Sequence, residues 1–461
     1  MRPVNRLPPE ILSRIARGVR DYLEGDMRTI IPLTRVCRYW RKSIISIPEN
    51  WTTISNSLKN LAALSLERAK AAFLEIHLDM WIMQGDPQFL NFLTSHFQNT
   101  ETLWVTGLTA VQDLSLLSRY PMINLQSLSL SDYQVTTWDR SIDPFELSAY
   151  ALRYLQLTRV PLYPSFLKIK TLTGLELCDY ECNLHLDTLL DFLEENRSLT
   201  SAGLEIWFAE PSLRSSRRRA PIGNRLQSLR ITCHDAMDGR ALISSIALSK
   251  GAELEFTCQG TYDATVEVAD VLSGISTTHL SNLLSPTFMR YRVHPRIIKL
   301  HGPNGTASFF GHSLWDIPFA EFPLLSLANI RRFHLDNCGR EMVQSPDDLA
   351  AFNHLPSFSA LETFTIEHEA NLPHLPTLLS NPSASPSLRT LAFVHCVLTE
   401  EFMGELAQFA SDRKSTASAW LHRVVIIHQD GTFPSITSIR KLEKHVPVVD
   451  VRIATKLPMD L

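Results

Sequence analysis

The hexapeptide LRYLQL at residues 152–157 carries the pattern that organises most of this chain. Leucine stands at its first, fourth and sixth positions, and the same arrangement returns as LQSLSL at residues 125–130 and as LTGLEL at residues 172–177. Alternate residues of a short strand point to the same side, so the fourth and sixth residues of each copy enter one core and their neighbours face the other way. The pattern predicts a row of short strands, each with one apolar face.

Further copies of the pattern, with other apolar residues in place of some leucines, occur along the chain. They begin at Phe73, Leu199, Leu226, Ile330, Leu361 and Leu388. Neighbouring copies start 27, 20, 27 and 27 residues apart between residues 125 and 226, and 31 and 27 residues apart between residues 330 and 388. Because leucine-rich repeats have periods of about 20–29 residues, residues 71–461 resemble an irregular leucine-rich-repeat array.

This resemblance implies an α/β solenoid with parallel strands on its concave face and helices on its convex face. Helix-like stretches at residues 186–193 and 401–409 lie between the expected strands. The pattern fades between about residues 235 and 325, where the units are unclear. Residues 303–328 are expected to form an aromatic insertion, either a staple over the core or a docking element.

A different arrangement occupies the N-terminus, where LPPEIL at residues 7–12 precedes VCRYW at residues 36–40 and PENW at residues 48–51. Prolines suit the first turn of a helix, and Glu10 lies near the positive end of the helix dipole. Apolar residues then recur every three to four positions, which predicts short helices. Short helices bury little surface alone, so part of their apolar face is expected to contact another protein.

These three motifs, in this order and spacing, resemble the F-box, the helical module of ubiquitin-ligase substrate receptors, as in fungal-type F-box domain-containing proteins. The resemblance covers residues 5–52. It implies a three-helix F-box at residues 1–52, and residues 53–70 are expected to form a connecting helix. The family usually has an uninterrupted second helix, so Pro32 is expected to kink or restart it. A helical cap packed on the rest of the chain is the alternative.

The resemblance also implies a partner, a Skp-type adaptor that is itself bound to a cullin scaffold. The adaptor-binding residues that it implies are Leu7, Pro8, Pro9, Ile11, Leu12, Ile15, Val36, Cys37 and Trp40. Charge agrees with an acidic partner, because residues 1–50 hold ten Lys or Arg against five Asp or Glu, while the remainder holds 34 against 43. The acidic remainder argues against nucleic-acid binding.

Composition also bears on the compartment. No window approaches eighteen uninterrupted apolar residues, and the N-terminus lacks an apolar segment of signal-peptide length. The seven cysteines are an odd number spread along the whole sequence, which fits reduced thiols. We therefore expect no membrane association and a cytoplasmic and/or nuclear location.

Residues with metal-binding or nucleophilic chemistry are few and poorly spaced. The segment Cys178–Cys182 and the pair Cys233-His234 lack the spacing of a four-ligand zinc site, and His395-Cys396 are neighbours that point oppositely in a strand. No glycine-rich phosphate loop is present. The sequence predicts no enzyme, catalytic centre, metal site or cofactor, and it predicts that Cys338 and Cys396 are buried in the repeat core.

The function expected from both parts is that of a substrate-recognition subunit of an SCF-type ubiquitin ligase. A protein-interaction scaffold or inhibitor without a ubiquitin role is the alternative. The unknown target is expected on the concave face and on the insertion, at Tyr154, Glu176, Arg230, Trp315 and Phe319. The run from Arg214 to Arg219 is either a solvated loop or a nuclear-import or phosphorylation-controlled patch.

Overall fold

The computed structural model describes residues 7–22, 30–83, 86–108, 113, 117, 119–132, 151–182, 184–214, 222–223, 225–258, 286–292, 297–302, 305–311, 327–336, 358–367, 385–415, 420–428 and 434–453. These residues form an α/β structure that divides into two compact units. The first comprises Met1–Cys182 with Glu195–Glu205, and the second Asn183–Glu194 with Ile206–Leu461. The boundary between the two units lies within residues 71–461, which the repeat pattern predicts to be a single array.

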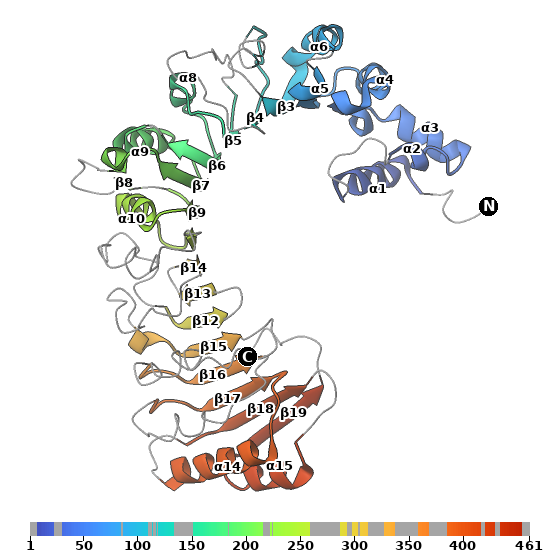
Figure 1. Cartoon of the computed structure of the whole chain (residues 1–461). Coiled ribbons are helices and arrows are strands. Elements are labelled where there is room, and N and C mark those ends of the chain that lie inside the picture. Colours follow the sequence, from blue (N-terminus) through green and yellow to red (C-terminus); the bar gives the residue numbers. More distant parts are fainter. Residues whose placement is uncertain are drawn as a thin grey trace. The chain divides into compact units, whose positions relative to one another are not determined.

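A helical region opens the first unit (Figure 1). Its helices are α1 (Pro9–Tyr22), α2 (Ile30–Leu33) and α3 (Arg38–Ser46). Helix α2 has four residues and contains Pro32, which removes a backbone donor from the helix. A buried hydrogen bond of 3.0 Å from Ser13 Oγ to Asn50 Oδ1 ties α1 to the segment that follows α3.

Parallel strands follow the helical region. They are β1 (Thr53–Ser55), β2 (Leu74–Asp79), β3 (Thr100–Leu108), β4 (Ser127–Asp132), β5 (Tyr154–Thr158), β6 (Gly174–Cys182) and β7 (Ser201–Phe208), which continues past the unit boundary. Strands β1 to β6 pair in parallel and in chain order. Leu128, Leu155 and Leu175 lie in register on β4, β5 and β6 and are buried, which confirms the predicted pairing of the leucine motifs.

Two details at the start of this sheet differ from expectation. Residues 53–55, expected to be helical, form β1, because Ile54 continues the core row and pairs with Ile76 of β2. Helix α4 (Lys59–Ala69) occupies only the later part of the expected connecting helix. Phe73, expected in the core, is 53% exposed, because β2 begins at Leu74 and buries Leu74, Ile76 and Leu78 instead.

The strands are entered through one recurring backbone arrangement. The carbonyl of the residue directly before a strand accepts hydrogen bonds from two consecutive N–H groups at the start of the next strand in the sheet. Such carbonyls belong to Gln126, Arg153 and Thr173 in the first unit and to Thr287, Arg331, Glu362 and Arg389 in the second. The spacing seen in the sequence is thus a repeat of backbone geometry as well as of leucines.

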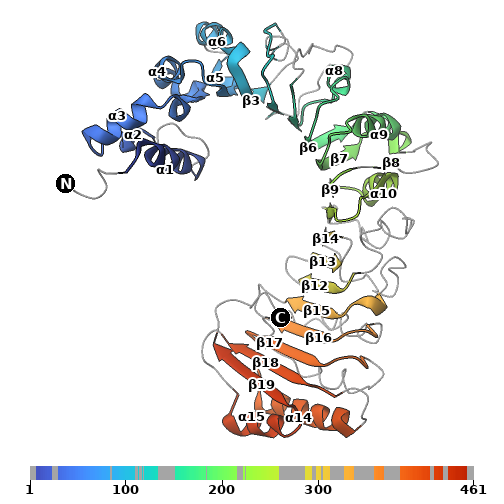
Figure 2. The ribbon, with the colours of Figure 1, turned by 180° about the vertical axis from the view of Figure 1, so that it is seen from behind.

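The second unit continues the pattern of parallel strands with one interruption (Figures 1 and 2). Its strands are β8 (Ile222–Gly223), β9 (Ser228–Cys233), β10 (Ile246–Ala247), β11 (Glu253–Cys258), β12 (Phe288–Arg292), β13 (Ile297–Gly302), β14 (Gly305–Gly311), β15 (Arg332–Asp336), β16 (Thr363–Glu367), β17 (Thr390–Val394), β18 (Arg423–His428) and β19 (Val448–Ile453). The parallel ladders are β9–β11–β14 and β12–β15–β16–β17–β18–β19, and β8 pairs in parallel with β10.

The interruption is the meander of β12, β13 and β14, in which β13 runs antiparallel to both neighbours. Residues 305–311 therefore form a strand, so the first part of the expected insertion belongs to the sheet. Gly302 pairs with Gly305 at the end of the β13–β14 ladder, so the two strands meet at a pair of glycines.

Helices accompany the strands in both units. Besides α4, they are α5 (Met80–Met83), α6 (Pro87–Thr94), α8 (Pro164–Leu167), α9 (Leu186–Glu195), α10 (Ala236–Ser245), α14 (Glu400–Ser415) and α15 (Ile436–Glu443). Helices α9 and α14 confirm the two predicted helical stretches. Helix α14 packs against strand β17. The ring of Phe402 on the helix meets the ring of Phe393 on the strand edge to face, with centroids 5.5 Å apart.

The alternation of buried and exposed residues, expected in every strand, fails in β15 to β18. His334, Thr365, Ala392 and Val425 occupy the positions expected to face a concave surface, and all four are buried. A strand covered on both faces becomes apolar along its whole length, and the run from Val424 to Ile427 in β18 shows this composition. In the described residues of these four strands, neither face of the sheet is therefore exposed to solvent at this row.

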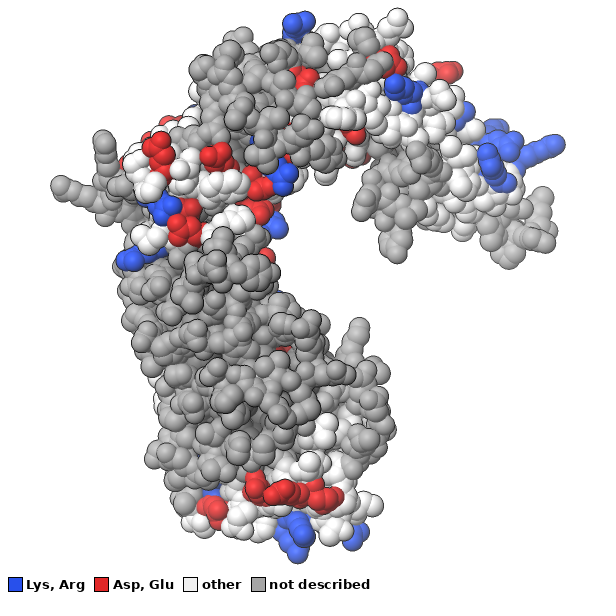
Figure 3. Space-filling view, in the orientation of Figure 1, with Lys and Arg blue, Asp and Glu red and all other residues white. Residues whose placement is uncertain are grey.

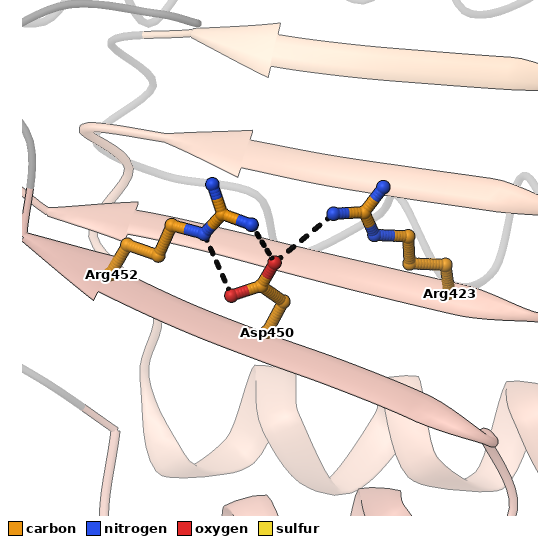
Figure 4. Close-up of polar contacts among 3 residues, drawn as sticks. All are labelled: Arg423, Asp450 and Arg452. Atoms are coloured by element: carbon orange, nitrogen blue, oxygen red, sulfur yellow. Dashed lines mark hydrogen bonds and ion pairs between the residues drawn. The ribbon is translucent and has the colours of Figure 1, made fainter.

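Beyond this apolar face, charged residues occupy β19 (Figure 4). Asp450 accepts a hydrogen bond of 2.8 Å from Arg452 Nε and lies 3.0 Å from Arg423 Nη2 on β18. Hydrogen bonds from Arg452 and then Arg423 lower the pKa of Asp450 from its ordinary value of 3.8. A charged strand of this kind also discourages edge-to-edge aggregation.

Replacing Asp450 by Asn is expected to cost about 0.2–1 kcal/mol at neutral pH, the usual range for an ion pair near the surface. A lowered folded-state pKa adds stability above the unfolded pKa, and that stability is lost as the pH falls through the folded pKa. The difference between the two proteins should therefore be present at pH 7 and should shrink below about pH 4. Urea unfolding at several pH values measures this, and a pH-independent difference would rule out the ion pairs as its cause.

Candidate functional site

The residues predicted to bind an adaptor divide into two groups in the structure. Pro8, Pro9, Ile11 and Val36 are exposed, and Ile11 and Val36 show 38% and 54% of their surface. Leu7, Ile15 and Cys37 are half-buried. The hydroxyl of Tyr39 donates to the Leu7 carbonyl at 2.7 Å and brings the start of α3 against the segment before α1. We call Leu7, Pro8, Ile11, Val36 and Tyr39 the N-terminal apolar surface.

The other group supports this surface from inside. Leu12 is fully buried and Trp40 is 7% exposed, so their side chains pack within the helical region and are not part of its surface. Cys37 caps α3, because its Sγ accepts from the Trp40 N–H at 3.4 Å. The first turn of α1 is stabilised by the Pro8 carbonyl, which accepts hydrogen bonds from the N–H groups of Ile11 and Leu12 at 3.1 and 3.2 Å.

Basic side chains surround the N-terminal apolar surface. Figure 3 shows Lys and Arg atoms gathered over the helical region. The exposed basic residues of α1, of α3 and of the turn before α3 are Arg14, Arg17, Arg35, Arg38, Arg41 and Lys42. An apolar centre with a basic rim is suited to an acidic protein partner, because rim charges of opposite sign steer association.

A second candidate surface is the face of the β1–β7 sheet opposite the leucine core, within the first unit. One row across it consists of Ser55, His77, Trp104, Ser129, Gln156 and Glu176. A neighbouring row consists of Thr53, Glu75, Thr102, Ser127, Tyr154 and Gly174. We call this surface the first-unit sheet face. It includes the predicted target-binding residues Tyr154 and Glu176.

An aromatic pair forms one end of this face. The rings of His77 and Trp104 stack with centroids 5.5 Å apart and planes only 4° from parallel, and Trp104 remains 40% exposed. Glu75 fixes the orientation of His77, because its Oε1 lies 2.9 Å from His77 Nε2 while its Oε2 accepts from Thr53 Oγ1 at 3.1 Å. The indole thus lies on a firmly held support.

Two glycines at the other end let larger side chains lie across the neighbouring strand. A Cβ on Gly174 would lie 2.7 Å from Tyr154 Cδ2, and a Cβ on Gly203 would overlap with Glu176 Oε2. Contacts under 3.0 Å are not tolerated, so any other residue at either position would displace Tyr154 or Glu176. The glycines therefore preserve the positions of the two predicted side chains.

Of the remaining predicted target-binding residues, one lies on a strand of the second unit and two lie outside the described residues. Arg230 is exposed on β9 of the second unit, where it aligns with Glu255 of β11. Trp315 and Phe319 lie outside the described residues. Sequence reasoning overlooked Tyr39, His77 and Trp104, and only the strand register reveals that His77 and Trp104 are neighbours.

The first residue of the arginine run has a structural role. Arg214 forms ion pairs of 2.9 Å with Asp235 and with Asp238, whose side chain is 1% exposed. Burial raises the pKa of Asp238, and Arg214 opposes that shift. The Asp238 Oδ2 atom also accepts from the Phe208 N–H at 3.2 Å. Residues 215–219 lie outside the described residues, so the two interpretations of that patch both stay open.

Residues with metal-binding chemistry do not converge in the described part of the chain, where no three His, Cys, Asp or Glu side chains are close enough to share an ion. Cys396 is 2% exposed and its thiol lies 3.4 Å from the carbonyls of Ile366 and Val394, which confirms its predicted place in the core. Cys338 lies outside the described residues. Within the described ranges, none of the helices has the length and apolar composition needed to span a membrane.

Comparison with known proteins bears on the first of the two surfaces. Residues 4–57 match the model of the F-box-like family, so the helical region with the N-terminal apolar surface is an F-box-like domain. Domains of this family generally bind Skp-type adaptors. A search among curated proteins returned no match to the chain.

Proposed function

We propose that this protein is a substrate-recognition subunit of an SCF-type ubiquitin ligase and has no catalytic activity of its own. The N-terminal apolar surface binds the Skp-type adaptor, which connects to a cullin scaffold, and the strand-rich remainder binds a target protein. The observation that carries the proposal is the exposure of Pro8, Ile11 and Val36 on an F-box-like domain whose helices are fixed from inside by Leu12 and Trp40.

The remainder of the chain is proposed to be an irregular leucine-rich-repeat-like solenoid. Support comes from the in-register row of Leu128, Leu155 and Leu175 and from the double hydrogen bond that recurs before successive strands. Each unit of such an array exposes apolar area until a neighbour covers it, so stacking stabilises all units together. An array of this kind offers a wide surface rather than a deep pocket, which suits a protein target.

The mechanism in this proposal is positional. Holding a target near a ubiquitin-charged conjugating enzyme raises the effective concentration of its lysines, and well-oriented groups react far faster than freely diffusing ones. The residues proposed for the first step are those of the N-terminal apolar surface, and those for target binding lie on the first-unit sheet face. We place this activity in the cytoplasm and/or nucleus, without a role for a cofactor, a membrane or nucleic acid.

Exchange of Leu7 and Pro8 for alanine should abolish co-purification of a tagged Skp-type adaptor with the full chain. A few central residues dominate most interfaces, each costing more than about 2 kcal/mol when truncated, so two such losses should weaken binding by roughly a thousandfold. Both changes preserve the Pro8 carbonyl that starts α1. Adaptor capture by pull-down, with circular dichroism to confirm folding, measures the effect.

Val36→Glu provides a second test, because it places a charge on a side chain that is 54% exposed. Val397→Glu is the matched control, since Val397 is 58% exposed in the second unit. The proposal requires loss of adaptor with Val36→Glu and retention with Val397→Glu. Retention by every variant would favour the alternative, a protein-interaction scaffold without a ubiquitin role.

A further inference from the structure

The strands β15 to β19 of the second unit all begin at one edge of the sheet, because they run parallel to one another. We call the first residue of each strand, together with the residue directly before it, the second-unit strand edge. Its members, none of which is buried, are Arg331, Arg332, Glu362, Thr363, Arg389, Thr390, His422, Arg423, Pro447 and Val448. Four arginines and one carboxylate thus occupy this edge, although residues 51–461 as a whole hold more Asp and Glu than Lys and Arg.

The carboxylates on and beside this edge are already paired with arginines. The Glu362 carboxylate lies 3.9 Å from the Arg331 guanidinium. Asp450, further along β19, lies 3.0 Å from Arg423 and also accepts a hydrogen bond from Arg452 (Figure 4). Each of these carboxylates therefore has at least one arginine of its own, and Asp450 has two.

Arg332 and Arg389 carry the remaining positive charge. Both are exposed, and neither forms an ion pair with another described residue. Beyond β15, the equivalent residues of β12, β13 and β14 include no Asp or Glu, and the first carboxylate in that direction is Glu253 of β11, four strands from Arg332. The positive charge of the two arginines is thus not balanced from the rest of the sheet.

Helices α14 and α15 end at the same edge. Lys414 of α14 lies 5.7 Å from the ring centroid of Trp420, whose Nε1 donates to the carbonyl of His445 after α15. The exposed charged residues at these helix ends are Asp412, Lys414, Arg440, Lys441, Glu443 and Lys444, four basic and two acidic. Basic residues at a helix C-terminus also stabilise the helix, but this explanation does not apply to Arg332 and Arg389, which belong to the strand edge.

We infer that the second-unit strand edge binds an acidic segment of the target protein, with carboxylates at Arg332 and Arg389. A guanidinium donates two parallel hydrogen bonds to one carboxylate, so an exposed arginine without an ion pair is suited to this ligand. The inference names the chemistry of the target and therefore rests on the proposed function. It adds a second contact to the one proposed on the first-unit sheet face.

Nucleic acid is the competing occupant, and two observations disfavour it. Affinity for nucleic acid comes from many phosphate contacts, whereas five strands at about 4.8 Å spacing give this edge a length of only about 19 Å. The net negative charge of residues 51–461 would also repel a long polyanion. A short acidic segment of a protein meets neither obstacle.

The strand register also sets the spacing of the acidic residues. Arg332 and Arg389 belong to the edges of β15 and β17, which are separated by β16. Two strand spacings amount to about 10 Å, and an extended peptide advances about 3.3 Å per residue. The two carboxylates that contact these arginines should therefore stand about three positions apart in the target.

Fluorescence anisotropy with the full chain and a labelled peptide of repeated Glu-Ser-Ser units tests this inference. Each exposed ion pair contributes about 1.5- to 5-fold in affinity, so Arg332→Glu combined with Arg389→Glu should weaken binding by roughly tenfold. The matched control is Arg197→Glu combined with Arg225→Glu, because both residues are exposed away from this edge and the change in net charge is the same. Circular dichroism confirms that both double variants are folded, and a Gln-Ser-Ser peptide should bind roughly tenfold more weakly than the Glu-Ser-Ser peptide.

Several results would overturn the inference. They are equal binding of the two peptides, equal losses in the two double variants, and tighter binding of a thymidine oligonucleotide that depends on Arg332 and Arg389, which would make nucleic acid the occupant. Adaptor co-purification from the same samples separates the inference from the proposed function. Adaptor capture by wild type without peptide binding refutes only the inference, whereas peptide binding that depends on the two arginines without adaptor capture refutes only the ligase role.

Discussion

Replacing Leu155 by alanine is expected to destabilise the first unit by about 2–5 kcal/mol, the range for truncating a buried leucine. Leu155 is fully buried and lies in register between Leu128 on β4 and Leu175 on β6. The cavity would therefore adjoin both neighbouring strands, and in a stacked array each strand depends on its neighbours. Hydrogen exchange should show loss of protection in β4, β5 and β6 together.

The controls for this substitution lie nearby. Gln156→Ala changes the next residue of the same strand on the opposite face, and Ile123→Ala removes aliphatic atoms from a side chain that is 56% exposed. Ile123→Ala should stay within about 0.5 kcal/mol of wild type, as surface substitutions usually do. Gln156→Ala also removes the acceptor of the Ser129 hydroxyl and should cost about 0.5–1.5 kcal/mol, still below the expected cost of Leu155→Ala. Loss of protection confined to β5, or spread equally through both units, would contradict the stacked arrangement.

The leucine copies could be predicted because their signal is local and regular. Strands whose core residues depart from that pattern were overlooked. In β3, Thr100 takes the position expected for a leucine and is fully buried, and its hydroxyl compensates by donating to the His96 carbonyl at 3.4 Å. In β18, Leu421, Val424 and Ile426 match the pattern, but Val425 and Ile427 are apolar as well, so no alternation marks a strand with one exposed face. A template of apolar positions misses a polar core residue such as Thr100.

The meander of β12 to β14 was overlooked for a different reason. Its turn signal, Pro303-Asn304 between two glycines, is clear in the sequence, but the reversal of β13 depends on pairing with β12 and β14. Long-range pairing also decides the burial of His334 and Ala392 on the second face of the sheet. A period of two in one strand gives no information about what covers its outer side.

The candidate site shows the same division between local and long-range information. The motif at residues 7–12 located the N-terminal apolar surface, since a helix start and its partner residues are close in sequence. The stack of His77 on Trp104 joins residues on two strands, and only their register makes them neighbours. Burial likewise separates Leu12, a core residue, from Ile11, a surface residue, although the two are adjacent.

Trp51→Ala is expected to unfold the F-box-like domain, with a loss of roughly 3–5 kcal/mol for a buried tryptophan. Trp51 is 3% exposed, its Nε1 donates to the Ile44 carbonyl at the end of α3 at 3.1 Å, and the Arg68 guanidinium of α4 lies 4.2 Å from its ring centroid. One side chain thus joins the helical domain to the helix that precedes β2. Hydrogen exchange should show loss of protection in α1 and α3, with adaptor binding lost in parallel.

Two further variants decide how Trp51 acts. Trp51→Phe keeps most of the ring but removes the hydrogen bond, which leaves the buried Ile44 carbonyl with one donor fewer and should cost about 1 kcal/mol beyond the lost ring area. Trp81→Ala removes a tryptophan that is 63% exposed in the same unit and should stay within about 0.5 kcal/mol of wild type. If Trp51→Ala proved as mild as Trp81→Ala, the helical domain would be held by its other contacts, among them the Ser13–Asn50 hydrogen bond and the buried Leu12. The F-box-like domain would then be separable from the strands, whereas a severe loss means that adaptor binding and the integrity of the first strands are coupled through one indole.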